Sequence, residues 1–281
     1  MTTPSRDSVI AANIEVHTVL AHQYNEDEPH FRPENLAKVK GRLQELATSV
    51  GGGRLLDIGC GTGFVLALAV DFFDELQGVD ATQAMLDRVD TSSGKVHVQQ
   101  GLAEEVPFED ASFDAVTAYS FLHHLLDHKP AFAEAYRVLR PGGRFYIDLE
   151  PNRRFWAAIR RASDMSQTGV ELDPLVQREV GELLSIEDEM QEAHGIDPEI
   201  FRNAEFTKSI LDGFDPSEFQ SDLEAAGFVD VEVQLDWFLG QAAIMHGTSF
   251  EAAQGMDDHL RRLLPTTDHL FKYLRATATK R

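Results

Sequence analysis

The chain has 281 residues, 43% of them hydrophobic, which is enough to build a packed core. Its 47 acidic residues outnumber its 25 lysines and arginines, and the formal net charge is -22. A surface of that sign repels phosphate backbones, so DNA and RNA are not expected as partners. The single cysteine, Cys60, excludes an intramolecular disulfide and a zinc site built from cysteines.

The sequence also bears on location. Met1–Asp7 has no apolar signal region, and no stretch approaches the roughly 20 apolar residues that a membrane-spanning helix needs. Together with the lone cysteine, these features predict a cytoplasmic protein without membrane insertion.

Two amphipathic helices are predicted before the first strand. Ser5–Tyr24 carries Val9, Ile10 and Ile14 on one side, and Arg32–Val50 has apolar residues at helical spacing. A strand, Arg54–Ile58, follows them.

A glycine-rich turn directly follows that strand. The sequence from Leu55 reads Leu-Leu-Asp-Ile-Gly-Cys-Gly-Thr-Gly and leads into a predicted helix, Phe64–Val70. Glycines at every second position allow positive φ and let a ligand approach the main chain. This spacing differs from the dinucleotide fingerprint and from the phosphate loop, so phosphate binding is disfavoured. The next predicted strand, Glu75–Val79, ends at Asp80, where a parallel sheet would offer a carboxylate to a ribose diol.

Strands and helices alternate up to Glu150, which is typical of a doubly wound parallel sheet. A turn at Pro141–Gly143 is predicted to end the helix Ala131–Leu139. The fold class is therefore α/β: a Rossmann-like, seven-stranded, mostly parallel sheet with one antiparallel edge strand, helices on both faces and an inserted helical cap. The remaining strands of the first part are predicted at Val96–Gln99, Phe113–Tyr119 and Arg144–Leu149.

The pattern becomes helical after Glu150. Helices are predicted at Arg153–Met165, Leu172–His194, Pro198–Leu211 and Pro216–Gly227. A strand, Val229–Trp237, and an antiparallel return at Gln241–His246 follow. Two further helices, Ser249–Leu264 and Thr267–Ala278, serve either folding or contact in a possible homodimer.

Four blocks of sequence carry a resemblance to a known family. They are Leu55–Gly63, Gly78–Met85, Gly101–Phe113 and Phe121–Ile147. In order and separation they resemble the class I S-adenosylmethionine (SAM)-dependent methyltransferases, in particular the small-molecule subgroup similar to the ubiquinone/menaquinone-biosynthesis enzymes. The resemblance implies SAM as cofactor, S-adenosylhomocysteine as product and a small-molecule substrate.

The resemblance also implies roles for individual residues. Asp57 and the loop Gly59–Gly63 would hold the methionine end of SAM, Asp80 the ribose, and Ala81 and Met85 the adenine. Leu102 stands where the family often has an acid, so the side-chain hydrogen bond to the adenine amino group is either missing or made by Glu104. The cofactor-binding residues implied in this way are Asp57, Gly59, Cys60, Gly61, Gly63, Asp80, Ala81, Met85, Ala103, Glu104, Ser120 and Tyr24.

The division of the chain follows from the same comparison. Residues 1–50 would form helices over the cofactor site, 51–150 the SAM-binding core, 151–215 a helical substrate cap, and 216–281 the end of the sheet with the last helices.

Candidates for catalysis and substrate contact lie near the ends of the fourth and fifth predicted strands. His123 and His124 are the candidate bases, because an imidazole titrates near neutrality; they could instead only orient the loop. Substrate contacts are expected from Tyr119, His128, Glu150, Arg153, Arg154 and Trp156. For the arginines, a solvated face paired with acids is the alternative, and for Trp156 burial in the core. His17, His22 and His30 could reach the pocket if the first helices fold over it.

Two classes of function remain open. The first is a methyltransferase acting on an oxygen, carbon or nitrogen of a small metabolite. The second is a protein of the same fold that transfers no methyl group, such as a SAM- or S-adenosylhomocysteine-binding subunit or a SAM-assisted cyclase or decarboxylase. No histidine or acid pattern stands out at metal-ligand spacing, so no metal is expected.

Overall fold

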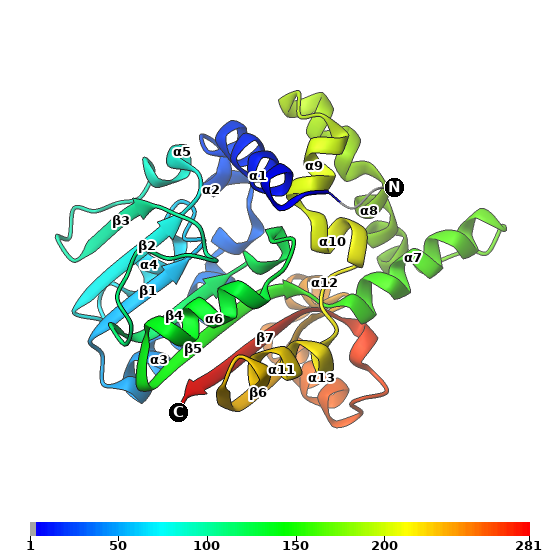
Figure 1. Cartoon of the computed structure of the whole chain (residues 1–281). Helices are drawn as coiled ribbons and strands as arrows, with labels where there is room; N and C mark the ends of the chain where they lie inside the picture. The colour runs from blue at the N-terminus through cyan, green and yellow to red at the C-terminus, as the bar shows by residue number, and fades with distance from the viewer. Residues whose placement is uncertain (1–3) are drawn as a thin grey trace.

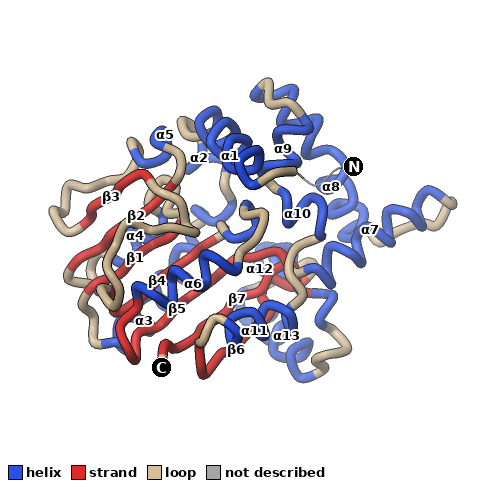
Figure 2. Tube along the Cα trace, in the orientation of Figure 1, coloured by secondary structure: helices blue, strands red, loops and turns tan. Residues whose placement is uncertain are grey.

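A computed structural model describes residues 4–281, so the first three residues of Met1–Asp7 lie outside it. The centre of the molecule is a seven-stranded sheet of order β3-β2-β1-β4-β5-β7-β6, shown in Figures 1 and 2. All neighbouring pairs are parallel except those made by β7, which runs antiparallel to β5 and to β6. The predicted α/β fold class is confirmed. The strands are β1 (Arg54–Ile58), β2 (Glu75–Asp80), β3 (Val96–Gln100), β4 (Phe113–Tyr119), β5 (Leu139–Pro151), β6 (Phe228–Phe238) and β7 (Phe271–Lys280).

The last third of the chain corrects two predictions. The return strand predicted at Gln241–His246 is wrong, because this alanine-containing segment forms helix α12 (Gln241–Gly247). The helix predicted at Thr267–Ala278 is also wrong, because Phe271–Lys280 is β7. That segment inserts between β5 and β6, one place in from the edge, where both neighbours supply backbone hydrogen bonds. The predicted turn at Pro141–Gly143 lies inside β5, where the pairing register with β4 shifts.

Helices cover both faces of the sheet, as the alternation of side chains in β4 requires. Ala115 and Tyr119 face α3 (Pro33–Val50) and α4 (Phe64–Ala69), and share a core cluster with residues of both helices. Val116 and Ala118 belong to the other cluster, with residues of α6 (Lys129–Val138) and α11 (Pro216–Ala225). The sheet is therefore buried between two helical layers.

The segment between β5 and α11 is helical, as predicted, but it contains one more helix. The predicted helix Pro198–Leu211 is two helices, which separate at Glu205, where φ is -101° and ψ is 32°. The four helices are α7 (Arg153–Gln167), α8 (Pro174–His194), α9 (Pro198–Ala204) and α10 (Phe206–Leu211). Helix α7 projects from the body in Figure 1.

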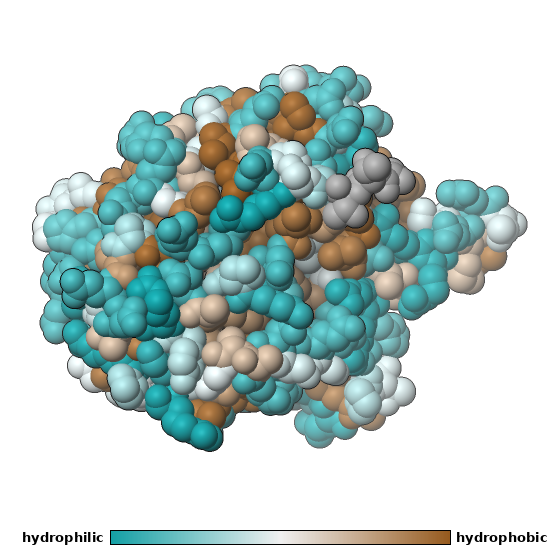
Figure 3. Space-filling view, viewed as in Figure 1, coloured by the Kyte–Doolittle hydropathy of each residue, from teal (hydrophilic) through white to brown (hydrophobic). Residues whose placement is uncertain are grey.

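The first helix packs on this segment. Helix α1 (Arg6–Leu20) begins at Ser5, whose hydroxyl accepts the Ser8 backbone N–H at 3.2 Å. Its Ala12 and Val16 form one cluster with Ile196, Phe201 and Ala204 of the segment around α9. We call α1, α9 and α10 the roof. Figure 1 shows α1 and α9 side by side, and Figure 3 shows apolar residues gathered on this part of an otherwise largely hydrophilic face.

Shorter elements and the last helix complete the chain. They are α2 (Tyr24–Asp27), η1 (Pro29–Phe31), α5 (Gln83–Leu86), η2 (Leu122–His124), α13 (Phe250–Arg262) and η3 (Asp268–Leu270). Among residues 4–281, no helix has the length and apolar character required to cross a membrane.

A buried ion cluster ties α3 to the far end of the sheet. Asp236 of β6 accepts from Lys38 at 3.0 Å and from Arg42 at 2.6 Å, and Arg42 also donates to Asp148 of β5 at 2.7 Å. Burial raises the pKa of Asp236, but the charges of Lys38 and Arg42 outweigh burial and bring it to about 2. The cluster therefore holds α3 on the sheet through a carboxylate that is charged at neutral pH.

We predict that Asp236→Ala destabilises the fold by about 3–5 kcal/mol, because it leaves Lys38 and Arg42 without their shared buried partner. Urea unfolding at neutral pH measures this change. The matched control, Asp71→Ala, removes an exposed partner of Lys40 and should cost at most about 1 kcal/mol. Equal losses for the two variants would contradict the assignment.

Candidate cofactor and acceptor site

The candidate site lies where β1 and β4 end. Between these two adjacent strands the chain order reverses, and ligands of open α/β sheets bind outside the carboxyl ends at such a point. The glycine turn after β1, Asp80 at the end of β2 and Ser120 after β4 all line one cavity there. We call it the cofactor cavity.

The glycine turn is built from backbone conformations that favour glycine. Gly59, Gly61 and Gly63 have φ of 69°, 52° and 87°. A β-carbon on Gly59 would lie 2.1 Å from the ring of Phe121, so a side chain there cannot coexist with that ring. Gly63 is close-packed instead on Val89 and does not line the cavity.

Asp80 holds the glycine turn by hydrogen bonds to backbone N–H groups. Its two carboxylate oxygens accept the backbone N–H groups of Gly61 at 2.9 Å and of Thr82 at 2.8 Å. A carboxylate oxygen has further lone pairs, so ribose hydroxyls can still donate to it. Asp80 therefore links the glycine turn to β2 and keeps a charged acceptor at the cavity.

Asp57 lies beneath the turn and is almost completely buried. The Thr117 hydroxyl donates to it at 2.7 Å. Burial raises the pKa of Asp57 to about 7, although the hydrogen bond from Thr117 acts in the opposite direction. Because Asp57 lines the cavity, a bound cation would favour its ionised form.

The N-terminal segment closes the cavity from above. Arg6 of α1 donates to Glu104 at 3.2 Å across the cavity mouth. Asn13 and His17 of α1 also line the cavity, together with Tyr24 and His30, whose segment follows. Tyr24, His17 and His30 were candidates for this position, whereas His22 lines neither this cavity nor the pocket that adjoins it. Arg6 and Asn13 could not be predicted from the sequence, because only the packing of α1 on the segment around α9 brings them here.

The structure brings most of the predicted cofactor residues together. The remaining predicted members of the cavity wall lie on four separate loops of the core: Cys60, Ala81, Met85, Ala103, Glu104 and Ser120. Their positions agree with the expectation; their binding roles stay predictions.

A second pocket adjoins the first, and His30 and Ser120 line both. It is enclosed by η1 with the start of α3, the loop after β4, the end of β5, α8, α10, the end of β6 with α12, and β7. We call it the acceptor pocket. Its wall contains aromatic residues and charges of both signs, including Trp237, Tyr273, Arg178, Lys208, Lys272, Glu28 and Glu179.

Glu150 lies below the acceptor pocket rather than in its wall. It is completely buried and accepts the backbone N–H groups of Phe121, Leu122 and His123 at 2.9, 2.8 and 3.1 Å. The Nδ1 atom of His123 lies 2.9 Å from the same carboxylate. Glu150 therefore holds the loop after β4. The sequence had predicted a substrate contact for this residue, but Glu150 does not line the acceptor pocket.

Four other predicted substrate residues are not brought to either pocket. His128 hydrogen-bonds Asp222 on the α11 side, and Trp156 packs in a cluster with Phe155 and Val180. Arg153 pairs with Glu218, and Arg154 with Asp215 and Asp268. The arginines meet nearby acids, which is the alternative that their spacing had left open. Tyr119 does line the cofactor cavity, where its hydroxyl accepts from Asn35 at 2.9 Å.

The two candidate bases occupy the wall between the pockets. His124 lines the cofactor cavity and His123 the acceptor pocket. Glu205 is near both rings: its carboxylate lies 3.3 Å from Nδ1 of His124 and 3.9 Å from Nε2 of His123. Nothing in the sequence signalled Glu205, because it sits within an unbroken helical pattern.

Known proteins match the part of the chain that contains this site. Residues 56–147, which contain the glycine turn, Asp80 and the loop after β4, match the family model described as a methyltransferase domain. These residues are therefore similar to the methyltransferase domains of SAM-dependent enzymes. SAM is the cofactor of this family.

Individual relatives agree with this assignment. The chain is 35% identical to 27-O-demethylrifamycin SV methyltransferase of Amycolatopsis mediterranei over 137 residues, 46% of this chain and 50% of that protein. It is also 35% identical to the ubiquinone/menaquinone biosynthesis C-methyltransferase of Geotalea daltonii over 104 residues, 34% of this chain and 44% of that protein. The chain spans about half or less of these curated relatives.

Solved structures share the fold of the methyltransferase domain and its surroundings. The YcgJ protein of Bacillus subtilis has a TM-score of 0.52 at 22% identity, over 87% of this chain and 99% of that one. A phosphoethanolamine N-methyltransferase of Haemonchus contortus, solved with phosphomonomethylethanolamine and S-adenosylhomocysteine, has a TM-score of 0.57 at 17% identity, over 98% of this chain and 59% of that one.

The residues around the cofactor cavity fit SAM. The glycine turn leaves main chain exposed where a side chain would collide, as the Gly59 geometry shows. Two carboxylates, Asp57 and Asp80, face the same space, and Ala81, Met85 and Leu102 supply an apolar wall. SAM requires a carboxylate for its ammonium group, another for its ribose diol, and an apolar wall for its adenine base.

We predict that Gly59→Ala lowers both stability and SAM affinity, because the new methyl group displaces Phe121. Overpacking of this kind costs about 1–3 kcal/mol beyond the strain of positive φ. Gly94→Ala is the control, since Gly94 has a φ of 72° and open space around its β-carbon position. Urea unfolding and SAM titration of both variants check this, and an effect of Gly59→Ala no larger than that of Gly94→Ala would count against it.

A second prediction concerns Asp57 and pH. The unfolded chain releases this proton near a pKa of about 3.9 and the folded chain near about 7, so the fold loses stability from this group as pH rises between those values. Asp57→Asn removes the titration and keeps an acceptor for Thr117. The stability gain of the variant should therefore be larger at about pH 8 than at about pH 5. Urea unfolding at both pH values measures it; Asp71→Asn is the control, and a pH-independent difference would refute the mechanism.

Proposed function

We propose that this protein is a SAM-dependent methyltransferase acting on a small-molecule acceptor. The observation that carries the proposal is the pair of adjoining pockets, which share His30 and Ser120 as wall residues. One pocket has the groups that hold the cofactor, and the other gives an acceptor a place next to it. A transfer between two bound molecules needs that juxtaposition.

The residues of the cofactor cavity would divide the binding of SAM among them. The glycine turn and Asp57 would face the methionine end, Asp80 would accept from the ribose, and Ala81 and Met85 would contact the adenine. SAM, when bound, supplies a methyl group on a positively charged sulfur. The protein's task is then to align the acceptor and to exclude water.

Several features of this chain serve that task. The ion pair between Arg6 and Glu104 ties α1 across the cavity mouth. Tyr24 is a buried phenol whose pKa is raised by burial and by nearby acids, Glu28 first among them, so it stays neutral and can donate a hydrogen bond. His30 is also neutral, because burial lowers its pKa to about 4. Tyr24 and His30 thus offer polar groups without adding charge beside a cationic cofactor.

The acceptor pocket favours a small molecule of metabolite size with aromatic or apolar character. Trp237 and Tyr273 provide aromatic surface, while Lys272 forms an ion pair with the completely buried Glu179 at 2.5 Å. The names of the relatives include an O-methyltransferase of a rifamycin and a C-methyltransferase of quinone biosynthesis. We propose a natural-product or secondary-metabolite acceptor that receives the methyl group on oxygen, carbon or nitrogen.

The composition of the chain supports a proposal on its partners and location. The net charge of -22 supports a protein that does not bind nucleic acid. A cytoplasmic location and a homodimer complete this proposal; the lone Cys60, which is buried, is in keeping with the former.

Incubation of the full chain with methyl-tritiated SAM and a fractionated cell extract tests the activity. Label should appear in a small-molecule fraction together with S-adenosylhomocysteine, and not in nucleic acid or protein. Binding of SAM without label in any fraction would contradict methyl transfer and favour the second class of function, a SAM-binding protein that transfers no methyl group.

The acceptor pocket can be tested separately from the cofactor cavity. Ala242 of α12 lines the acceptor pocket only, so Ala242→Trp should fill it and lower kcat/KM for the labelled acceptor by roughly 100-fold, because the acceptor is displaced from its position. SAM affinity should stay unchanged. Ala243→Trp is the matched control: Ala243 neighbours Ala242 on the same helix, is exposed and lines neither pocket. Equal activity of the two variants would place the acceptor elsewhere.

A further inference from the structure

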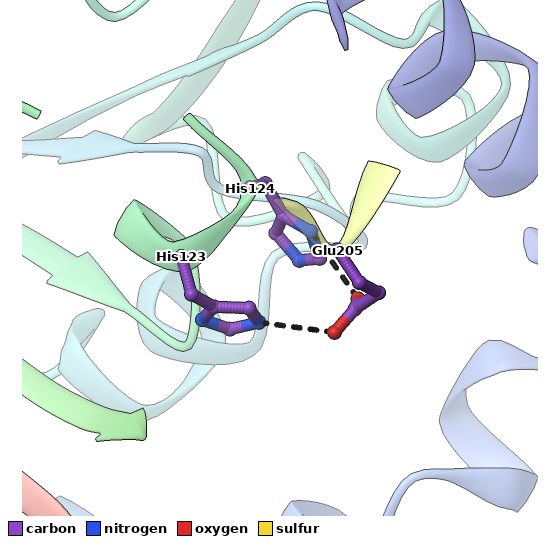
Figure 4. A group of neighbouring side chains, drawn as sticks. All are labelled: His123, His124 and Glu205. Atoms are coloured by element: carbon purple, nitrogen blue, oxygen red, sulfur yellow. Dashed lines mark ion pairs between the residues drawn. The ribbon is translucent and has the colours of Figure 1, made fainter. Parts of the chain in front are cut away.

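Three potential metal ligands converge on the wall between the two pockets. His123 and His124 lie on η2, and Glu205 lies where α9 ends and α10 begins. One ligand atom from each lies within 4.8 Å of the others, and Figure 4 shows the three side chains turned toward a common space. Two imidazoles and one carboxylate suit zinc and neighbouring divalent transition metals.

The spacing between the ligand atoms fits one ion. Bonds of about 2.0–2.2 Å in tetrahedral geometry place ligand atoms roughly 3.3–3.5 Å apart. The Glu205 carboxylate lies 3.3 Å from Nδ1 of His124 and 3.9 Å from Nε2 of His123. The first distance already fits a common centre, and the second has to shorten when an ion binds.

An outer contact orients one of the two rings as in known metal sites. Nδ1 of His123 is held by the buried carboxylate of Glu150 at 2.9 Å, and in the tautomer that donates from Nδ1 this ring keeps a lone pair on Nε2, the atom that lies 3.9 Å from Glu205. Nδ1 of His124 lies 2.9 Å from the carbonyl of Ala204 and 3.3 Å from Glu205, so a metal bound through this atom replaces its contact with Ala204. A carboxylate or carbonyl behind a ligating histidine is the usual arrangement around protein-bound metals.

The break in the roof supports the same conclusion. Residues 198–211 contain no glycine, and the only proline is the first residue, so helical propensity does not explain a break at Glu205. The break presents the carboxylate of Glu205 to the histidine pair and the carbonyl of Ala204 to His124.

We propose that His123, His124 and Glu205 bind one divalent transition-metal ion, such as zinc, on the wall between the cofactor cavity and the acceptor pocket. Three protein ligands leave a position for water or for an acceptor atom. Lys208 is the competitor in this arrangement, since its ammonium lies 3.3 Å from Glu205 and neutralises the same carboxylate. Metal binding therefore has to displace Lys208 from Glu205.

Metal titration of the full chain tests the proposal without any measurement of methyl transfer. Protein stripped with a chelator is titrated with cobalt(II), whose visible absorption reports its coordination, and with zinc in competition with a chromophoric chelator. Wild type should bind one ion. Glu205→Gln should weaken zinc binding by at least roughly 100-fold, and Lys208→Met should strengthen it, because the competing charge is gone. Glu187→Gln, on a carboxylate of α8 paired with Arg202, is the control and should bind like wild type.

The outcomes separate this proposal from the proposed function. The absence of one-to-one binding in both wild type and Lys208→Met would overturn the metal site and leave the cluster as an ion-paired group, with methyl transfer unaffected. Equal affinities of Glu205→Gln and Glu187→Gln would also overturn it, by assigning the bound ion to other residues. If Glu205→Gln does not fold, Lys208→Met decides, because an affinity for the ion no higher than that of wild type would overturn the site.

Discussion

The two pockets depend on one buried carboxylate, that of Glu150 at the end of β5. It receives three consecutive backbone N–H groups of the loop after β4, and it holds the ring of His123 as well. A fully buried carboxylate is tolerated only when its oxygens are satisfied in this way. Because the loop is held there, Phe121 lies on Gly59 and the two histidines stand between the pockets. One interaction therefore sets the wall of the cofactor cavity and that of the acceptor pocket.

The roof supplies what the sheet alone does not. The carboxyl ends of β1, β2 and β4 provide an open site with two carboxylates and a glycine turn, as in other sheets of this class. Helix α1 packs on the segment around α9 through an apolar cluster and meets the core through Arg6 and Glu104. The cavity is thus lined by the core and by the segment that precedes it, and the later segment around α9 acts on the cavity by holding α1 in place.

The sequence predicted the part of the site that local patterns determine. Asp57, the glycine turn and Asp80 follow strands whose apolar runs are plain, and all three lie at the cofactor cavity. The segment that forms β7 was predicted as a helix. No local pattern identifies it as a strand, because its strand pairing depends on its two neighbours in the sheet, β5 and β6. The acids opposite Arg153 and Arg154 are about 60 or more residues away, so no local pattern could show that these arginines are already paired.

Glu205 illustrates the same limit more sharply. Helical periodicity continues across residues 198–211, and the break lies where Ala204 and Glu205 contact the histidines of a loop some 80 residues earlier. Sequence patterns locate elements, whereas the tertiary contacts of those elements decide which polar side chains meet. The acceptor pocket, built from seven separate parts of the chain, is accordingly the part of the site that the sequence left least defined.

The central claim is that the cavity formed by the glycine turn and Asp80 binds SAM. Calorimetric titration of S-adenosylhomocysteine into the intact chain and into Asp80→Ala tests it most directly, because the demethylated ligand binds without turning over. The account predicts one-to-one binding to the intact chain and its loss in the variant, with both proteins folded. Absence of binding to the intact chain, or equal binding to both proteins, would contradict it.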